Sequence, residues 1–315
     1  MKRALVLSGG GAKGSYQLGV YKALKRLGIK IDIITGTSIG SINGALFVSG
    51  DYLKAKRLWL NVSTDNLFDY GFDNKKDMQK LAKEIILNKG LKFDKAEKFL
   101  NKILDEKKIR KSKIDYGLVT VNLKSMVPKM LTKEQIPNGK LISYIIASST
   151  CFPAIEMKEI DGEYYIDGGY YDNLPINLAI DMGADEIIAV DLSAIGIKQK
   201  IKDKAIKIDY IKNSNKQKFT LDFDKETAKK NIKLGYNDTM KYYKKLKGKM
   251  LIGYIYNKYM NSDGKEDVYK KLFNIALVFQ KDFLAALYLI SISSKYPITL
   301  KSDRFFEEIF ASIKK

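Results

Sequence analysis

Residues 31–48 read IDIITGTSIGSINGALFV, which predicts a strand, a tight turn and a helix in direct succession. The apolar, β-branched run Ile31–Thr35 is typical of a buried strand, and Ile39–Val48 is typical of a buried helix. Between them, Gly36-Thr37-Ser38-Ile39-Gly40 has the G-x-S-x-G pattern of a nucleophile elbow. Its two glycines remove side chains where such a turn is tightest. The stretch therefore predicts an α/β fold that presents Ser38 at the end of a strand and the start of a helix.

A second glycine-rich turn lies upstream. Gly9-Gly10-Gly11-Ala12-Lys13-Gly14 follows the apolar run Arg3–Ser8 and precedes the helical pattern Gln17–Leu27. Backbone N–H groups at such a helix start lack partners and favour negative charge. In a hydrolase, these amides would form the oxyanion hole for a carbonyl under attack. The succession of strand, glycine loop, helix, strand, turn and helix indicates a parallel sheet with crossover helices.

The chain contains no histidine, the side chain that most often activates a catalytic serine. If Ser38 is a nucleophile, its proton acceptor must be a carboxylate, a lysine or a tyrosine. Asp167-Gly168-Gly169 follows the predicted strand Glu163–Ile166 and offers a carboxylate at a strand end. Asp172 is its near competitor. A plain Asp-Gly turn is the structural alternative for Asp167.

Both glycine turns have other interpretations. Gly9, Gly11 and Gly14 also fit the G-x-G-x-x-G pattern of dinucleotide-binding proteins. That pattern needs an acidic residue at the end of the second strand, whereas Asp32 stands near its start. Ser38, for its part, could simply cap the helix that begins at Ile39.

The length and composition of the chain favour an organisation in two parts, a domain and a lobe. At 315 residues and 45% hydrophobic, the chain can form one large α/β domain with an appended lobe. Strand-like runs end near Gly196 and helical periodicity follows, so we expect a catalytic domain over residues 1–196 and a lysine-rich helical lobe over 197–315. The single cysteine excludes an internal disulfide, and without histidine we expect neither a metal nor a cofactor.

The remaining predicted elements are helices at 52–59, 75–88, 94–105 and 141–148, strands at 114–122, 129–132 and 185–192, and a hairpin at 157–166.

The formal charge of +20 comes almost entirely from lysine. Because lysines are spread along the chain and arginine is scarce, we expect no nucleic-acid partner and consider an anionic membrane surface instead. The apolar residues of Tyr269–Ile292 could supply a membrane contact, although packing in the core of the lobe is the more common use of such residues. Neither the first apolar run nor Phe283–Ile292 is long enough for a signal peptide or a membrane span. We therefore expect a location in the cytoplasm or at the periphery of a membrane.

The two glycine turns and Asp167-Gly168-Gly169 resemble, in order and spacing, the three motifs of the patatin-like phospholipase family. The resemblance extends over residues 3–195. It continues through Ala147-Ser148-Ser149 to Phe152-Pro153 and through Asp172-Asn173-Leu174-Pro175 to Ala189-Val190-Asp191.

The resemblance implies a three-layer α/β/α sandwich with a mostly parallel central sheet. It further implies a serine acyl hydrolase of the phospholipase A or lysophospholipase type, which cleaves fatty-acyl esters of lipids or phospholipids through an acyl-enzyme and needs no metal. The implied dyad is Ser38 and Asp167, with Gly9, Gly10 and Gly11 as the oxyanion loop. Two alternatives stay open, an inactive protein that binds lipid surfaces and a dinucleotide-dependent enzyme that uses the Gly9–Gly14 loop.

Overall fold

The computed structural model describes residues 1–67, 90–213 and 223–259, without the side chains of residues 65, 66 and 244–259. Its strands are β1 (Arg3–Leu7), β2 (Ile33–Thr37), β3 (Asp115–Asn122), β4 (Pro128–Thr132), β5 (Lys158–Ile160), β6 (Glu163–Asp167), β7 (Glu186–Asp191) and β8 (Lys207–Lys212). Its α-helices are α1 (Ser15–Arg26), α2 (Ile39–Val48), α3 (Tyr52–Asn61), α4 (Thr64–Leu67), α6 (Asp94–Ile103), α7 (Glu106–Lys111), α8 (Leu141–Ala147), α9 (Ile176–Asp181) and α10 (Lys225–Tyr259). Two short 3-10 helices, η1 (Gly11–Gly14) and η2 (Gly168–Tyr170), follow β1 and β6.

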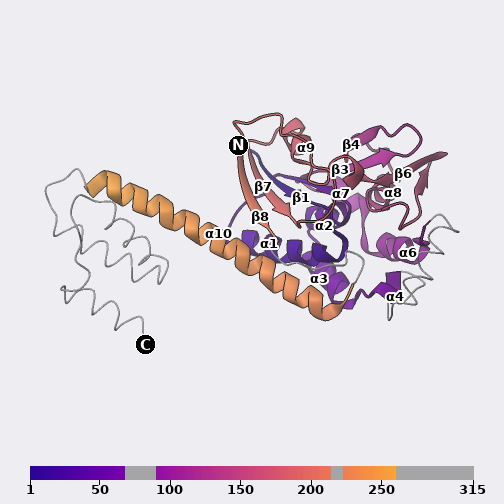
Figure 1. The fold of residues 1–315 in the computed structure, drawn as a ribbon, viewed down its shortest axis with the longest axis horizontal. Helices are drawn as coiled ribbons and strands as arrows, with labels where there is room; N and C mark the ends of the chain where they lie inside the picture. The colour runs from indigo at the N-terminus through magenta and orange to yellow at the C-terminus, as the bar shows by residue number, and fades with distance from the viewer. Residues whose placement is uncertain (68–89, 214–222, 260–315) are drawn as a thin grey trace. The chain divides into compact units, whose positions relative to one another are not determined.

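The strands form one sheet in the order β5-β6-β3-β2-β1-β7-β8, with β4 paired to β3 (Figure 1). The five strands from β3 to β8 in this order are parallel to one another. By contrast, β4 and β6 run antiparallel to β3, and β5 runs antiparallel to β6. The carboxyl ends of β1 and β2, where both glycine turns begin, therefore lie at the same edge of the sheet.

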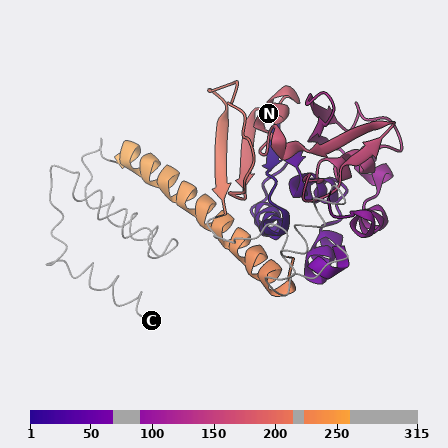
Figure 2. The ribbon, with the colours of Figure 1, turned by 45° about the vertical axis from the view of Figure 1, so that its right-hand side comes forward.

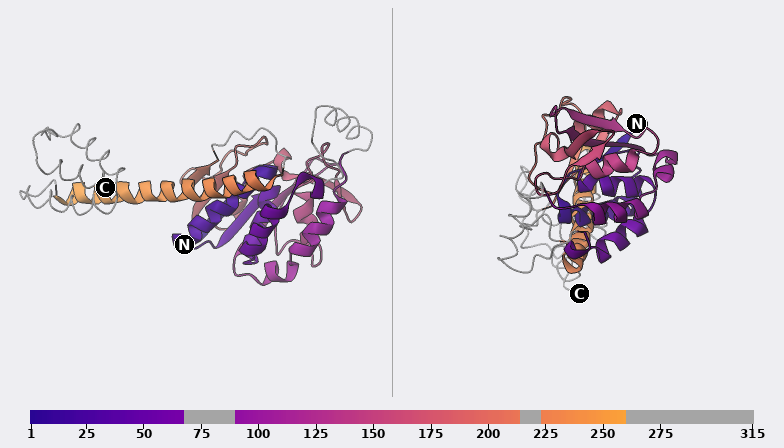
Figure 3. Two further views of the ribbon diagram at one scale, coloured as in Figure 1. Left: turned by 90° about the horizontal axis from the view of Figure 1, so that it is seen from below. Right: turned by 90° about the vertical axis from the view of Figure 1, so that its right-hand side faces the viewer.

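Helices cover both faces of the sheet. Successive side chains of a strand point to opposite faces, so a strand made of apolar residues has two apolar faces to be covered. On β1, Ala4 and Val6 belong to the cluster of buried residues that includes Ile176 and Ala179 of α9. Leu7 lies on the other face, where Gly44 of α2 packs close to its side chain. Figures 1 and 2 show α1, α2 and α3 on one side of the strands and α9 on the opposite side, and Figure 3 shows the same layering from two further directions. The predicted three-layer α/β/α sandwich is confirmed.

Most predicted elements are present within a few residues of their expected bounds. The strand expected at Ile31–Thr35 is β2, which begins later and runs to Thr37, directly into the elbow. The hairpin turns at Asp161 and Gly162, both with positive φ (54° and 79°), as a two-residue turn requires. The helix expected at 75–88 and the apolar segment Tyr269–Ile292 lie outside the described residues.

The expectation that strands end near Gly196 is wrong. Residues Lys207–Lys212 form β8, which extends the parallel sheet beyond β7. Contacts within the chain define a first compact unit, Met1–Thr239, and a second, Met240–Lys315. In the first unit, α10 is held to α1 by the hydroxyl of Tyr16, which donates to Asp238 at 2.9 Å. The functional division between residues 1–196 and 197–315 stays a prediction.

Within the described part of the chain, no helix combines the length and the apolar character that a membrane crossing requires.

Candidate active site

Ser38 occupies the turn between β2 and α2, and its backbone is in an unusual conformation (φ 56°). Glycine is required on both sides of it. A Cβ on Gly36 would lie 2.4 Å from the carbonyl oxygen of Gly40, and a Cβ on Gly40 would lie 2.3 Å from that of Leu7. The side chain of Ser38 makes no capping hydrogen bond to α2. The alternative in which Ser38 merely caps the helix is therefore wrong, and its hydroxyl is left for another role.

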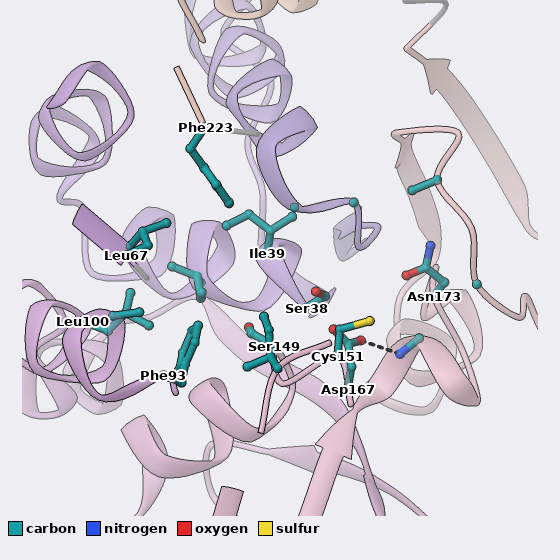
Figure 4. Close-up of a pocket in the computed structure, with 18 of the residues that line it drawn as sticks. Ser38, Ile39, Leu67, Phe93, Leu100, Ser149, Cys151, Asp167, Asn173 and Phe223 are labelled. Carbon is teal, nitrogen blue, oxygen red and sulfur yellow. Dashed lines mark hydrogen bonds between the residues drawn. The ribbon is translucent and has the colours of Figure 1, made fainter. Parts of the chain in front are cut away.

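Asp167 ends β6, and its carboxyl group is buried (6% exposed). One oxygen, Oδ1, accepts a hydrogen bond from the N–H of Gly169 at 2.7 Å (Figure 4). Burial raises the pKa of Asp167 from 3.8 to about 6, although hydrogen bonds from the Ser38 hydroxyl and from the Gly169 N–H oppose the rise. The structure thus brings together the predicted serine and the predicted carboxylate, and it gives that carboxylate a higher proton affinity than an exposed aspartate has.

Asp172, the competing carboxylate, is also buried and also has a pKa raised to about 6 by burial. Its Oδ1 accepts hydrogen bonds from the backbone N–H groups of Leu174 at 3.2 Å and Gln199 at 3.5 Å. Unlike Asp167, it does not line the pocket that contains Ser38. The geometry therefore favours Asp167 as the partner of Ser38.

The glycine turn differs in one respect from the expected oxyanion loop. The N–H of Gly9 donates to the carbonyl oxygen of Asn173 at 3.1 Å, so this amide is already engaged. Gly10 and Gly11 line the same pocket as Ser38, and the hydrogen bonds of the described residues include none from their N–H groups. The turn therefore offers two free amides rather than three.

Ser148, at the end of α8, was missed by the sequence analysis as a functional residue. Its fully buried hydroxyl oxygen accepts a hydrogen bond from the N–H of Ser38 at 2.9 Å. Its carbonyl oxygen accepts from the N–H of Gly168 at 3.4 Å, and the carbonyl of Thr150 accepts from the N–H of Asp167 at 2.8 Å. Residues 148–150 therefore connect the backbone of the serine to that of the aspartate. The sequence signals for this were a polar residue at the end of an apolar helix and its position in Ala147-Ser148-Ser149, which carried part of the family resemblance.

Asn173 was missed as well. Its backbone N–H donates to the carbonyl of Ile197 at 2.6 Å, and its carbonyl accepts from Gly9. The side chain lines the pocket, is only 2% exposed and leaves its Nδ2 without a hydrogen-bond partner among the residues that the structure describes. A buried unpaired donor in a pocket wall is a group that a bound ligand can satisfy. The sequence signal was its position in Asp172-Asn173-Leu174-Pro175, which carried part of the family resemblance.

The pocket itself has a volume of about 710 Å³ and is predominantly apolar beyond the serine. Its apolar lining comes mainly from α2, α3 and α6, together with Phe223 (Figure 4). Trp59 and Phe223 stack with ring centroids 6.0 Å apart in this lining. A pocket of this size and composition suits a small ligand with a long apolar part.

Comparisons with known proteins agree with this geometry. The family model described as "Patatin-like phospholipase" matches residues 5–180. "Patatin-like phospholipase domain-containing protein 7" of Rattus norvegicus is 31% identical over 203 residues, which cover 61% of this chain and 14% of that protein. "Lysophospholipase nte1" of Aspergillus terreus is 33% identical over 196 residues, which cover 61% of this chain and 12% of that protein. The match thus spans about one seventh or less of these relatives.

Among solved structures, VipD from Legionella pneumophila aligns with a TM-score of 0.43 and 16% identity, over 76% of this chain and 66% of that one.

Proposed function

The chain belongs to the patatin-like phospholipase family, and on this premise we propose that it is a serine acyl hydrolase that cleaves fatty-acyl esters of lipids. The predicted family is thereby confirmed. One observation carries the proposal: Ser38 and the buried carboxylate of Asp167 line the same apolar pocket, where the Ser38 hydroxyl lowers the pKa of that carboxyl against the effect of burial. The substrate is a lipid with at least one ester-linked acyl chain, of the kind that phospholipase A or lysophospholipase enzymes hydrolyse.

In the proposed reaction, Asp167 takes the proton from the Ser38 hydroxyl while Oγ attacks the ester carbonyl carbon. The carbonyl oxygen becomes negative in the tetrahedral intermediate, where the N–H groups of Gly10 and Gly11 stabilise it. When the intermediate collapses, the bond to the alcohol breaks and Asp167 returns the proton to the leaving oxygen. Water, deprotonated by the same carboxylate, then attacks the acyl-enzyme and releases the fatty acid.

The environment of Asp167 suits both halves of this cycle. A pKa of about 6 keeps the carboxylate ionised at neutral pH, so it can accept the serine proton. The same raised pKa makes it a stronger base than an exposed aspartate, which narrows the gap to the proton affinity of the serine. The apolar lining excludes water and would hold the acyl chain, so the ester lies against Ser38.

We also propose that the enzyme acts at a lipid surface. Lipid substrates reside in bilayers, and a formal charge of +20 attracts a protein to anionic headgroups.

The replacement of Ser38 by alanine tests the proposal. We expect Ser38→Ala to reduce the hydrolysis of short p-nitrophenyl esters to background while the circular dichroism spectrum stays unchanged. In the unaltered protein, a fluorophosphonate probe should label the peptide that contains Ser38 and not the one that contains Ser149. Ser49→Ala, at the end of α2, is the matched control, because the Ser49 hydroxyl donates to a carbonyl of its own helix. A fully active Ser38→Ala protein would refute the dyad, and vesicle binding without any turnover would favour an inactive lipid-binding protein.

A further inference from the structure

Three large hydrophobic side chains line the pocket and are nevertheless exposed to solvent. Ile195 is 103% exposed, Ile197 54% and Tyr170 39%. A residue that lines a pocket and is also exposed must lie where the pocket opens, so we call these three residues the entrance rim. The other large hydrophobic side chains exposed in the described part of the chain, such as Leu53 and Met126, do not line the pocket. Three of the nine large hydrophobic side chains exposed in the described residues thus lie at the opening of an apolar cavity.

The loop that carries Ile195 and Ile197 of the entrance rim is anchored through its backbone. The carbonyl of Ile197 accepts from the N–H of Asn173 at 2.6 Å, and its N–H donates to the carbonyl of Gly169 at 3.0 Å. Lys198 forms an ion pair with Asp191 at 2.7 Å. Gly196 packs so closely on Asn173 that a Cβ would lie 2.7 Å from that side chain. Because the backbone is fixed against the catalytic segment, the exposure of Ile195 is a consequence of the fold.

A basic segment continues directly from the entrance rim. Lys198, Lys200, Lys202, Lys204 and Lys207 are all exposed and stand within ten residues. Three of them pair with acidic residues: Lys198 with Asp191, Lys202 with Asp181 and Lys207 with Glu186. Lys207 and Glu186 begin β8 and β7, at the opposite edge of the sheet from the pocket, so Lys198 and Lys200 are the lysines next to the rim in the chain. Lys200 has no acidic partner in the described residues. An apolar edge flanked by lysines is the combination that suits the boundary between anionic headgroups and acyl chains.

We propose that the entrance rim, together with Lys198 and Lys200, docks on an anionic lipid bilayer, with Ile195 and Ile197 inserted among the acyl chains. The inference rests on the proposed function, since it identifies the surface through which that function meets its substrate. In this arrangement the pocket opens at the depth where the ester bond of a lipid lies. An acyl chain would then pass from the bilayer to the apolar lining without crossing water.

Vesicle binding of the full chain in a Ser38→Ala background tests the docking surface without turnover. We expect Ile195→Ser with Ile197→Ser to weaken co-sedimentation with vesicles of phosphatidylcholine and phosphatidylserine by about tenfold or more, because two apolar side chains no longer leave water. The matched control is Leu53→Ser with Met126→Ser, which removes two exposed apolar side chains distant from the pocket and should leave the affinity within about twofold. Equal affinities for the two double variants would overturn the proposal. A monomer-to-dimer difference caused by the rim substitutions, seen by light scattering, would overturn it in favour of a second copy as the occupant.

Quenching by brominated lipids gives a second readout that does not depend on loss of binding. The tryptophan fluorescence of Ile195→Trp should be quenched in vesicles with brominated acyl chains, whereas that of Leu53→Trp should not. The buried Trp59 supplies the same background fluorescence in both variants. Equal quenching of the two variants would contradict insertion of the rim. Ser38-dependent hydrolysis of a soluble ester by the otherwise unaltered chain is measured separately. If that activity is absent, the proposed function fails; if it is present and the rim does not insert, only the docking surface fails.

Discussion

At the scale of single residues, Asp167 combines two properties that oppose each other. Its carboxyl group is buried at the end of β6, which raises its pKa to about 6, yet the proposed reaction needs it ionised. The Ser38 hydroxyl and the N–H of Gly169 stabilise the ionised form and so lower the pKa, but they offset only part of the desolvation. In this state Asp167 is a stronger base than an exposed aspartate, but burial of its ionised form lowers the stability of the fold. Both effects can be measured on one variant, Asp167→Asn.

The first effect concerns the rate. Asp167→Asn keeps the size of the side chain and removes its ability to accept the serine proton, so we expect turnover of a soluble ester to fall by about two to four orders of magnitude. Asp172→Asn is the control, because Asp172 is equally buried but does not line the pocket. Its effect on turnover should be much smaller. A larger loss from Asp172→Asn than from Asp167→Asn would mean that Asp172 is the base.

The second effect concerns stability and its dependence on pH. The folded pKa of Asp167 is about 6, above the value of 3.8 expected in the unfolded chain. The protonated carboxyl therefore favours the fold at pH below about 4, and this contribution is lost as the pH rises through about 6. Asp167→Asn should accordingly raise the free energy of unfolding by up to about 3 kcal/mol at pH 8 and hardly at all at pH 4. Urea unfolding curves at both values check this, and an equal change at both would exclude titration as the cause.

The sequence predicted some members of the site and missed others for a physical reason. Ser38 and Asp167 each stand at a strand end in a local pattern of glycines, which a single sequence displays. Ser148 and Asn173 act through hydrogen bonds to residues far away in the chain, such as the one from the Ser38 N–H to Ser148. Such contacts depend on how the strands are ordered in the sheet. The engagement of the Gly9 amide by Asn173 was hidden for the same reason.

At the scale of elements, strand and helix patterns predicted the sheet up to β7 and failed at β8. The segment KIDYIK is half lysine or aspartate, and only one of its residues, Ile211, is buried. Among the described strands it pairs with β7 alone and forms an edge of the sheet, where lysines protect against further strand pairing. Such a strand lacks the continuous apolar run of the buried strands β1 and β7. Its lysines were therefore grouped with the helical region that follows.

The packing of α10 on α1 depends on two glycines. A Cβ on Gly19 of α1 would lie 2.0 Å from the carbonyl oxygen of Ile232, and one on Gly235 of α10 would lie 2.2 Å from that of Tyr16. Here the backbones of the two helices approach too closely for any side chain. The contact explains why these helix positions carry glycine, which is otherwise unfavourable within a helix.

We therefore expect Gly19→Ala to lower the free energy of unfolding by about 1 to 3 kcal/mol, although alanine is the better helix former, because the added methyl group has to push the α10 backbone away. Arg26→Ala, at an exposed position of the same helix, should change it by less than about 0.5 kcal/mol. Chemical denaturation followed by circular dichroism measures both. A Gly19→Ala protein as stable as the parent would mean that α1 and α10 do not pack closely at this point.

At the scale of the whole molecule, charge and apolar surface are distributed differently. The 56 lysine and arginine residues, against 36 acidic ones, are spread along the entire sequence, whereas the entrance rim is one local feature beside the pocket. Dispersed charge attracts the protein to an anionic surface over a distance set by the Debye length, and apolar side chains contribute only on contact. The two contributions to membrane binding should therefore respond to different variables.

Salt concentration and lipid charge separate these two contributions. In the Ser38→Ala background, binding to anionic vesicles should exceed binding to zwitterionic vesicles, and the excess should shrink as salt rises, because screening shortens the reach of lysines worth about 1 kcal/mol each near the surface. Ile195→Ser with Ile197→Ser should lower the affinity for both kinds of vesicle by a similar factor and leave the salt dependence intact. Co-sedimentation at about 0.05 M and about 0.5 M NaCl measures both responses. Equal binding to the two lipids at both salt concentrations would assign the affinity to the entrance rim alone and leave the charge of +20 as a solvated surface.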